Sequence, residues 1–147
     1  MRSDTGGVVA MCIDDEAIDL KLNRRVLKRT GLYATILDFV SAEAALEHLS
    51  ANPEQRIDVI FLDINMPRMN GFDFLEAIKT EFRDDLVECV VIMLTTSLHP
   101  KDQARAEAIE LVREYLNKPL TDLDARRIAI QIGEQRLPGK VGKSARG

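Results

Sequence analysis

Apolar residues along the chain fall into five short runs, separated by longer segments of mixed polarity. Residues 8–13 (VVAMCI), 58–63 (DVIFLD) and 89–94 (CVVIML) are apolar almost throughout. Runs of this length between polar residues are typical of strands that are buried on both faces of a sheet. Residues 34–40 (ATILDFV) and 112–117 (VREYLN) are the two other runs of strand length. The pattern therefore predicts five strands.

A segment with helical character follows each predicted strand. In the first of these segments Ile18, Leu22, Val26 and Leu27 recur at helical spacing, and Gly31 is placed to cap the C-terminus of the helix. The five predicted helices cover residues 16–30, 41–49, 71–82, 101–110 and 121–134. Strict alternation of strands and helices implies an α/β fold, with a doubly wound parallel sheet and helices on both faces.

In an open parallel sheet, ligands bind beyond the carboxyl ends of the strands. The polar residues that end four of the predicted strands are Asp14-Asp15, Asp63, Thr95-Thr96-Ser97 and Asn117-Lys118-Pro119. Two like charges about 4 Å apart repel by roughly 4 kcal/mol at an effective dielectric constant near 20. Three carboxylates at one edge therefore require raised pKa values or a bound cation.

The chemistry of these residues favours a magnesium site. Carboxylate oxygens suit a hard divalent cation, and sparse protein ligation open to water suits Mg²⁺. Metal and Lys118 would supply positive charge for phosphoryl oxygens, and Asp63 could act as a nucleophile that forms an acyl phosphate. Each residue also has a plainer explanation alone, because the acid pair can cap a helix, the threonines can form a turn and Lys118 can be solvated. Only the combination indicates a site.

Charge is distributed unevenly along the 147 residues, whose formal net charge is -4. The last twelve residues (RLPGKVGKSARG) hold four of the 20 basic side chains and none of the 24 acidic ones, so residues 1–135 carry 16 − 24 = -8. An acidic body disfavours binding to nucleic acid. The basic tail is predicted to be disordered, and a partner-docking arm is the alternative.

The length of the chain and the positions of its cysteines predict one folded domain that needs no disulfide bonds. Cys12 and Cys89 each lie inside an apolar run, which favours buried thiols over a disulfide, a metal site or a redox site. No run approaches the roughly 18 apolar residues of a membrane span, so we expect a cytoplasmic chain with no membrane partner. The expected organisation is an N-terminal extension (1–7), a folded domain (8–135) and the basic tail (136–147).

Four motifs together resemble the receiver domain of two-component response regulators, of the single-domain kind that is like a chemotaxis regulator. They are IDDE, LDINMPRMNG, MLTTS and YLNKPL, each at the end of a predicted strand. The resemblance covers roughly residues 8 to 134. It implies a flavodoxin-like sheet of strand order 2-1-3-4-5 with five helices, Mg²⁺ as cofactor, and a phosphoaccepting signalling domain rather than an enzyme.

The resemblance also assigns roles to individual residues. It implies that Asp63 is the phosphoacceptor and that Lys118 pairs with the phosphoryl oxygens. The metal ligands would be Asp15 directly, Asp14 mainly through water, Asp63, and the backbone carbonyl of Asn65. A stand-alone receiver of this kind would take phosphate from a phosphohistidine donor.

Further expectations concern the switch and the turn after the acceptor. The resemblance implies that the Thr95 hydroxyl reorients toward the phosphoryl group and that Tyr115 moves inward. Thr96 remains an alternative for the switch hydroxyl, because the segment from Thr95 to Lys118 is one residue longer than is typical of a receiver. The length of the fourth helix is open for the same reason. The bond from Lys118 to Pro119 is expected to be cis. Gly71 is expected to supply a backbone conformation that other residues resist.

Exposed apolar residues are the candidates for partner binding. The upstream partner implied by the resemblance is a histidine kinase or a histidine phosphotransfer protein, which would approach Ile18; Leu22 is assigned to the core as an alternative. On the last helix, Leu123 and Ile130 lie opposite the expected buried face (Ala125, Ile128, Ala129 and Ile132). They form either a docking face, for an unidentified downstream protein or a weak homodimer, or two isolated surface aliphatics. His99 is expected to be a solvated loop residue.

Several other functions compete with the stand-alone switch. Within the same family, the chain could be a phosphorelay shuttle, a phosphate sink, or a pseudo-receiver that is not phosphorylated. A haloacid-dehalogenase-like phosphatase would carry Asp-x-Asp after its first strand, whereas Asp14 and Asp15 are adjacent. A flavodoxin-like cofactor binder is disfavoured, because the acid pair would repel a phosphate.

Overall fold

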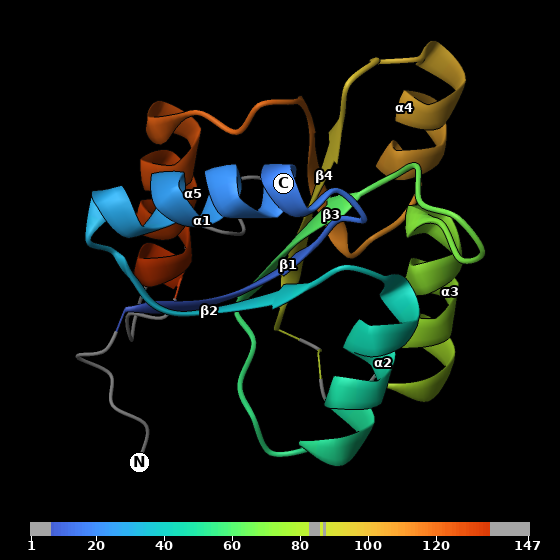
Figure 1. Ribbon diagram of the computed structural model, residues 1–147, viewed down its shortest axis with the longest axis horizontal. Coiled ribbons are helices and arrows are strands. Elements are labelled where there is room, and N and C mark those ends of the chain that lie inside the picture. Colours follow the sequence, from blue (N-terminus) through green and yellow to red (C-terminus); the bar gives the residue numbers. More distant parts are fainter. Residues whose placement is uncertain (1–6, 83–85, 87, 136–147) are drawn as a thin grey trace.

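The computed structural model describes residues 7–82, 86 and 88–135, in which five strands alternate with five helices (Figure 1). In chain order the elements are β1 (Val8–Ile13), α1 (Ala17–Thr30), β2 (Tyr33–Phe39), α2 (Ala42–Ala51), β3 (Val59–Asp63), α3 (Gly71–Glu81), β4 (Val90–Thr95), α4 (Pro100–Glu107), β5 (Val112–Asn117) and α5 (Asp122–Gln135). The predicted α/β class and the five strand-helix units are confirmed.

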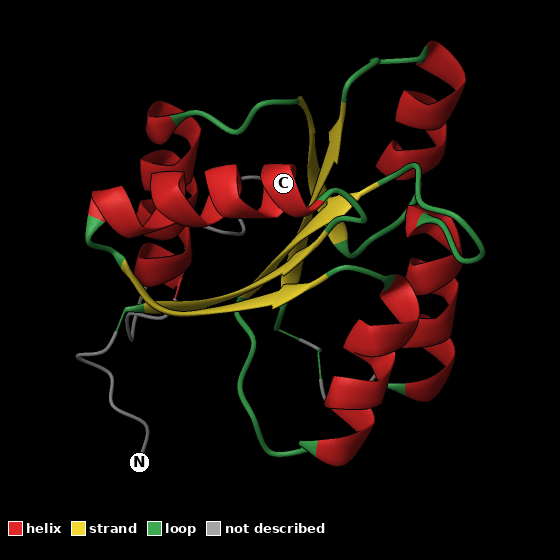
Figure 2. Ribbon diagram, in the orientation of Figure 1, coloured by secondary structure: helices red, strands yellow, loops and turns green. Residues whose placement is uncertain are grey.

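The five strands form one parallel sheet in the order β2-β1-β3-β4-β5, as the resemblance implied. Figure 2 shows the sheet between two layers of helices. Helices α1 and α5 cover one face, and α2, α3 and α4 cover the other. The order reverses at β1, so the carboxyl ends of β1 and β3 lie side by side at the centre of the sheet.

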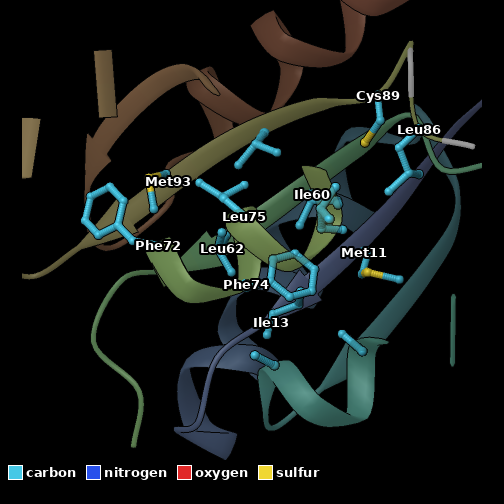
Figure 3. Close-up of a cluster of buried hydrophobic side chains, with 14 of the residues drawn as sticks. Met11, Ile13, Ile60, Leu62, Phe72, Phe74, Leu75, Leu86, Cys89 and Met93 are labelled. Atoms are coloured by element: carbon cyan, nitrogen blue, oxygen red, sulfur yellow. The ribbon is translucent and has the colours of Figure 1, made fainter. Parts of the chain in front are cut away.

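Each face of the sheet has its own hydrophobic core, which explains why the central strands are apolar throughout. Ile60 and Leu62 of β3 point toward the side of α2, α3 and α4, whereas Val59 and Phe61 of the same strand point toward α1 and α5. Figure 3 shows the first of these cores, where the following side chains gather: Met11, Ile13, Ile60, Leu62, Phe72, Phe74, Leu75 and Met93. Helix α3 contributes most of its apolar side chains to this core.

The buried face of α1 includes only part of the apolar set that recurs at helical spacing. Leu20, Asn23 and Leu27 are buried, whereas Ile18 and Leu22 are 70% and 45% exposed. The alternative that Leu22 belongs to the core is therefore wrong, and Ile18 is exposed, as a partner-binding candidate must be. Apolar residues on this helix fit two overlapping stripes of helical spacing, and packing against the sheet and α5 selects the stripe through Leu20 and Leu27.

Helix α4 is shorter than the predicted range 101–110. Pro100 occupies its first turn, and the ring nitrogen Nδ1 of His99, the residue before it, accepts a hydrogen bond from the backbone N–H of Lys101. After Glu107 the chain forms turns instead, in which the Ile109 N–H donates to the Ala106 carbonyl. The early end allows Ile109 and Leu111 to pack against the core before β5 begins.

The cysteine prediction is confirmed. Cys12 and Cys89 are buried free thiols, and burial raises the pKa of each well above its ordinary value. In the part of the chain that the structure describes, no helix has the length and apolar character needed to cross a membrane. The predicted extension, apart from Gly7, and the predicted basic tail (136–147) lie outside the described residues.

Candidate acidic site at the carboxyl ends of the strands

Three carboxylates meet where β1 and β3 end. Asp14 directly follows β1, Asp63 is the last residue of β3, and the two strands pair up to Ile13 and Leu62. One carboxylate oxygen from each of Asp14, Asp15 and Asp63 lies within 4.8 Å of the others. Asp14 is 1% exposed and Asp63 is 5% exposed, and Asp15 is the most exposed of the three. The three acids expected at one edge are therefore together.

Asp14 combines a local role with a role in the cluster. Its Oδ1 accepts a hydrogen bond from the Glu16 backbone N–H at 2.9 Å, which orders the turn into α1. Glu16, the N-cap residue, makes no capping hydrogen bond with its own side chain. The helix-start explanation for the acid pair is thus partly right, but it uses only one oxygen. The other oxygen, Oδ2, faces Lys118.

Lys118 reaches the acids from the end of β5. Its backbone N–H donates to the Thr95 carbonyl at 2.7 Å, and its bond to Pro119 is cis, as expected. Its Nζ lies 2.7 Å from Asp14 Oδ2 and 3.2 Å from Asp63 Oδ1. The side chain of Lys118 is 11% exposed, so the solvated-lysine explanation does not hold.

Asp19 is a site residue that the sequence reasoning missed. Its Oδ2 accepts a hydrogen bond from Lys118 Nζ at 3.0 Å, beside the one that Asp14 accepts. Asp19 lies in the first turn of α1, four residues after Asp15. Residues four apart share a helix face and side chains lean toward the helix N-terminus, so this spacing was the available signal.

The electrostatics of the cluster show a shortage of positive charge. Burial, and then the nearby charge of Asp14, raise the pKa of Asp63 to about 7, although Lys118 opposes the shift. Burial also raises the pKa of Asp14. Burial disfavours the charged form of Lys118, but the hydrogen bonds to Asp14 and Asp19 outweigh it and raise its pKa above the ordinary value. The single ammonium of Lys118 does not neutralise the carboxylates of the cluster. The carboxylate oxygens are hard ligands that fit a divalent cation such as Mg²⁺.

The turn after β3 requires glycine at position 71, but for a reason other than the predicted one. The left-handed residue of this turn is Arg68, with φ 65°. Gly71 does not have a positive φ; instead, a Cβ there would lie 2.7 Å from the carbonyl oxygen of Asp63 and 3.1 Å from Ile64 Cα. Glycine is thus required by close backbone approach. Asn65, whose carbonyl is the remaining predicted metal ligand, is exposed in the same turn.

Thr95 and Tyr115 occupy different surroundings. Thr95 is the last residue of β4 and is 1% exposed, whereas Thr96 is exposed. The Thr95 hydroxyl donates to the Ser97 carbonyl and accepts from the Ser97 N–H, both at 3.1 Å. Tyr115 is half-buried, and its hydroxyl oxygen is buried near the His99 backbone. Within the described residues this oxygen has no hydrogen-bond partner. Burial raises the pKa of Tyr115.

The three partner-binding candidates lie on the helices of one layer. Ile18 is 70% exposed on α1, and on α5 Leu123 is 75% and Ile130 is 47% exposed. The predicted buried face of α5 is confirmed for all four residues. None of the three candidates contributes a ligand atom to the acidic cluster.

The sequence pattern of the family described as "Response regulator receiver domain" matches residues 10–129. The chain belongs to this family. The receiver domain is a signalling domain of two-component systems, so the recognised resemblance is confirmed. The acidic cluster, with a hydroxyl and a lysine on neighbouring strand ends, lies at the carboxyl edge of the receiver sheet.

Individual relatives agree with this assignment. Chemotaxis protein CheY1 of Helicobacter pylori is 30% identical over 115 residues, which cover 76% of this chain and 85% of that protein. Two-component response regulator ARR6 of Arabidopsis thaliana is 30% identical over 129 residues, which cover 80% of this chain and 65% of that protein. A response regulator structure from Cytophaga hutchinsonii is 30% identical, with a TM-score of 0.81, over 86% of this chain and 97% of that one.

Several relatives are longer than the matched region. The match spans 9% of hybrid signal transduction histidine kinase C of Dictyostelium discoideum and 44% of transcriptional regulatory protein YvrH of Bacillus subtilis. Receiver domains thus occur both as most of a short protein and as part of a longer one. The family match by itself identifies the domain and not its pathway.

Proposed function

We propose that this receiver domain transfers a phosphoryl group from a phosphohistidine donor to Asp63 in a magnesium-dependent reaction, and that the product has a changed affinity for a partner protein. One observation carries the proposal: Asp14, Asp15 and Asp63 place carboxylate oxygens within 4.8 Å of one another, and Lys118 Nζ lies 3.2 Å from Asp63. This set combines a nucleophilic carboxylate, hard metal ligands and a cation for phosphoryl oxygens.

In the proposed transfer, a carboxylate oxygen of Asp63 attacks phosphorus. An O–P bond forms, the P–N bond to the donor imidazole breaks, and the imidazole keeps the electron pair. Bound Mg²⁺ would be held by Asp14, Asp15, Asp63 and the Asn65 carbonyl, and it would supply positive charge that keeps Asp63 ionised. Lys118 would hold a phosphoryl oxygen. The pKa of about 7 for Asp63 implies that the acceptor is only partly ionised at neutral pH before a cation binds.

The switch in this proposal is the Thr95 hydroxyl. Both of its present hydrogen-bond partners are backbone groups of Ser97, so it can exchange them for a phosphoryl oxygen by rotating about one side-chain bond. Burial at the end of β4 favours Thr95 over the exposed Thr96. Tyr115 is proposed to move inward as Thr95 turns, and its buried hydroxyl, which lacks a complete hydrogen bond among the described groups, supports such a change.

Partner contacts belong to the same proposal. A histidine kinase or histidine phosphotransfer protein in the cytoplasm would approach the acidic cluster over Ile18. An unidentified downstream protein, or a second copy in a weak homodimer, would contact Leu123 and Ile130. Their exposure supports a docking role, because large aliphatic side chains on a surface lose contact with water when a partner binds. A phosphorelay shuttle or a phosphate sink would use the same chemistry at Asp63 without the downstream contact.

The decisive experiment is phosphorylation of the purified chain with Mg²⁺ and phosphoramidate, a small donor with a P–N bond. We expect intact-mass spectrometry to show one added phosphoryl group, which chelation of Mg²⁺ or Asp63→Asn abolishes. Glu47→Gln, a charge removal on the exposed side of α2, serves as the matched control and should retain the adduct. Absence of an adduct on the wild-type chain would contradict the proposal.

A further inference from the structure

Lys118 has a carboxylate partner that the acceptor chemistry does not use. Its Nζ donates to Asp14 at 2.7 Å and to Asp19 at 3.0 Å, and it pairs with Asp63 at 3.2 Å. A lysine ammonium has three N–H donors. Two of them serve Asp14 and Asp19, and Asp63 lies at ion-pair distance. They come from the end of β1, the first turn of α1 and the end of β3.

Asp19 differs from the other two partners of Lys118. Asp14 and Asp63 belong to the acidic cluster, and their side chains are only 2% and 7% exposed. The Asp19 side chain is 34% exposed, and it is not part of the cluster whose oxygens lie within 4.8 Å. In the proposed reaction the Asp14 carboxylate interacts with the bound cation, and Asp63 becomes an acyl phosphate. Asp19 alone of the three keeps both its charge and its freedom to pair with Lys118.

Metal binding would weaken the contact between Lys118 and Asp14, because a divalent cation draws the carboxylate charge and repels the ammonium. Without another anchor, the long side chain of Lys118 would regain its rotamer freedom, and the ammonium would spend less time at the phosphoryl site. An anchor is therefore needed at the stage when the phosphoryl oxygens require Lys118. Asp19 is within hydrogen-bond distance to be that anchor.

We propose that Asp19 is a positioning residue that holds the Lys118 amine at the phosphoryl site while Asp14 and Asp63 are engaged. The proposal deepens the proposed function and rests on it. Among the described residues, Asp19 makes no hydrogen bond to the acceptor or to the metal ligands, and it acts through Lys118.

A simpler explanation of Asp19 is local. An acid in the first turn of a helix interacts favourably with the free backbone N–H groups there. That effect depends only on the position in α1 and does not require the carboxylate to reach a lysine 99 residues away. The two explanations differ in what a neutral substitution does to phosphorylation, as opposed to stability.

The test is Asp19→Asn in the full chain, which keeps the side-chain shape and removes the charge. We expect the rate constant for phosphorylation by phosphoramidate at saturating Mg²⁺ to fall roughly three- to tenfold, as for a partly exposed charge-assisted hydrogen bond. Binding of beryllofluoride, a noncovalent phosphoryl analogue, should weaken by a similar factor in fluorine NMR. The dissociation constant for Mg²⁺ alone, measured by calorimetry, should change less than either. Asp19→Glu should restore most of the loss.

A double substitution checks that the effect passes through Lys118. In a Lys118→Ala background, Asp19→Asn should cause no further loss of beryllofluoride affinity or phosphorylation rate. Glu47→Gln, which removes the same charge from α2, should behave as wild type. A full additional loss in the Lys118→Ala background would overturn the proposal.

The outcomes separate this inference from the proposed function. If the wild-type chain takes no phosphoryl group, the proposed function itself fails. If wild type and Glu47→Gln are phosphorylated and Asp19→Asn is equally fast or faster, only the role of Asp19 is refuted. A lowered melting temperature with unchanged phosphorylation kinetics would likewise assign Asp19 to helix stability alone.

Discussion

Strand β3 carries a buried aspartate at each end, and the two have different surroundings. Asp58, just before the strand, is 9% exposed, and Asp63, at its end, is 5% exposed. The Asp58 carboxylate accepts hydrogen bonds from the Val9 N–H and from Arg56, both at 2.8 Å. Asp63 is crowded by Asp14 and Asp15 and shares Lys118 with other acids.

The difference shows what makes a buried acid structural or functional. The donors at Asp58 belong to the neighbouring strand β1 and to the segment before β3, so the carboxylate ties these segments together. At Asp63 the neighbours are mostly acceptors, and the pKa rises to about 7. A buried carboxylate without enough donors is costly, and it persists where a cation or a reaction uses it.

The largest expected effect is a loss of stability when Asp58 is replaced. Asp58→Ala leaves the Val9 N–H and Arg56 without their acceptor, so we expect the free energy of unfolding to fall by about 2–4 kcal/mol. Denaturant unfolding at pH 7 measures the loss. Phosphoryl uptake by the folded protein should be retained, in contrast to Asp63→Asn. A stable Asp58→Ala that cannot be phosphorylated would break the comparison.

Gly71→Ala tests the close backbone approach beside Asp63, at the end of β3. The added Cβ would approach the Asp63 carbonyl oxygen at 2.7 Å, so the backbone must shift. We expect a loss of about 1–3 kcal/mol, typical of overpacking, together with slower phosphorylation. Gly133→Ala is the matched control, because a Cβ there meets no atom within 4 Å and α5 should gain stability, by up to about 1 kcal/mol. Equal stability of the two variants would contradict the close-approach explanation.

A smaller, pH-dependent effect should distinguish Asp63 itself. Its pKa is raised in the folded protein from 3.8 to about 7, so the folded state binds more protons between these values than the unfolded state does. The free energy of unfolding of the metal-free chain therefore falls as pH rises through this window, and the penalty is fully present above it. We expect Asp63→Asn to stabilise the metal-free protein by about 1–2 kcal/mol at pH 8 and by much less at pH 5.

Thermal unfolding at the two pH values, with and without Mg²⁺, measures this effect. Mg²⁺ should stabilise wild type more than Asp63→Asn at pH 8, because a ligand that binds only the folded state adds to its stability. A stabilisation by Asp63→Asn that is the same at pH 5 and pH 8 would show that the charge of Asp63 is not its origin.

Much of this architecture could be predicted because its determinants are local. Apolar runs of strand length, alternating with helical segments, predicted the five strand-helix units. The polar residues that end the strands predicted the cluster around Asp63 and the approach of Lys118. Asp19 was missed because its partner lies 99 residues away, and a first-turn acid has a sufficient local explanation. The core alternative for Leu22 was wrong because two apolar stripes overlap on α1, and only packing buries Leu20 and leaves Leu22 exposed.

The segment DVIFLD shows the division most clearly. By itself the sequence determined a buried strand with an acid at each end, because its four central residues are apolar and carboxylates resist burial within a strand. Only the tertiary structure decided that Asp58 meets a backbone donor from β1, whereas Asp63 meets Asp14, Asp15 and a shared Lys118. The reason is physical: the ionisation of a buried acid depends on the charges and donors that distant segments bring to it, and no local pattern contains them.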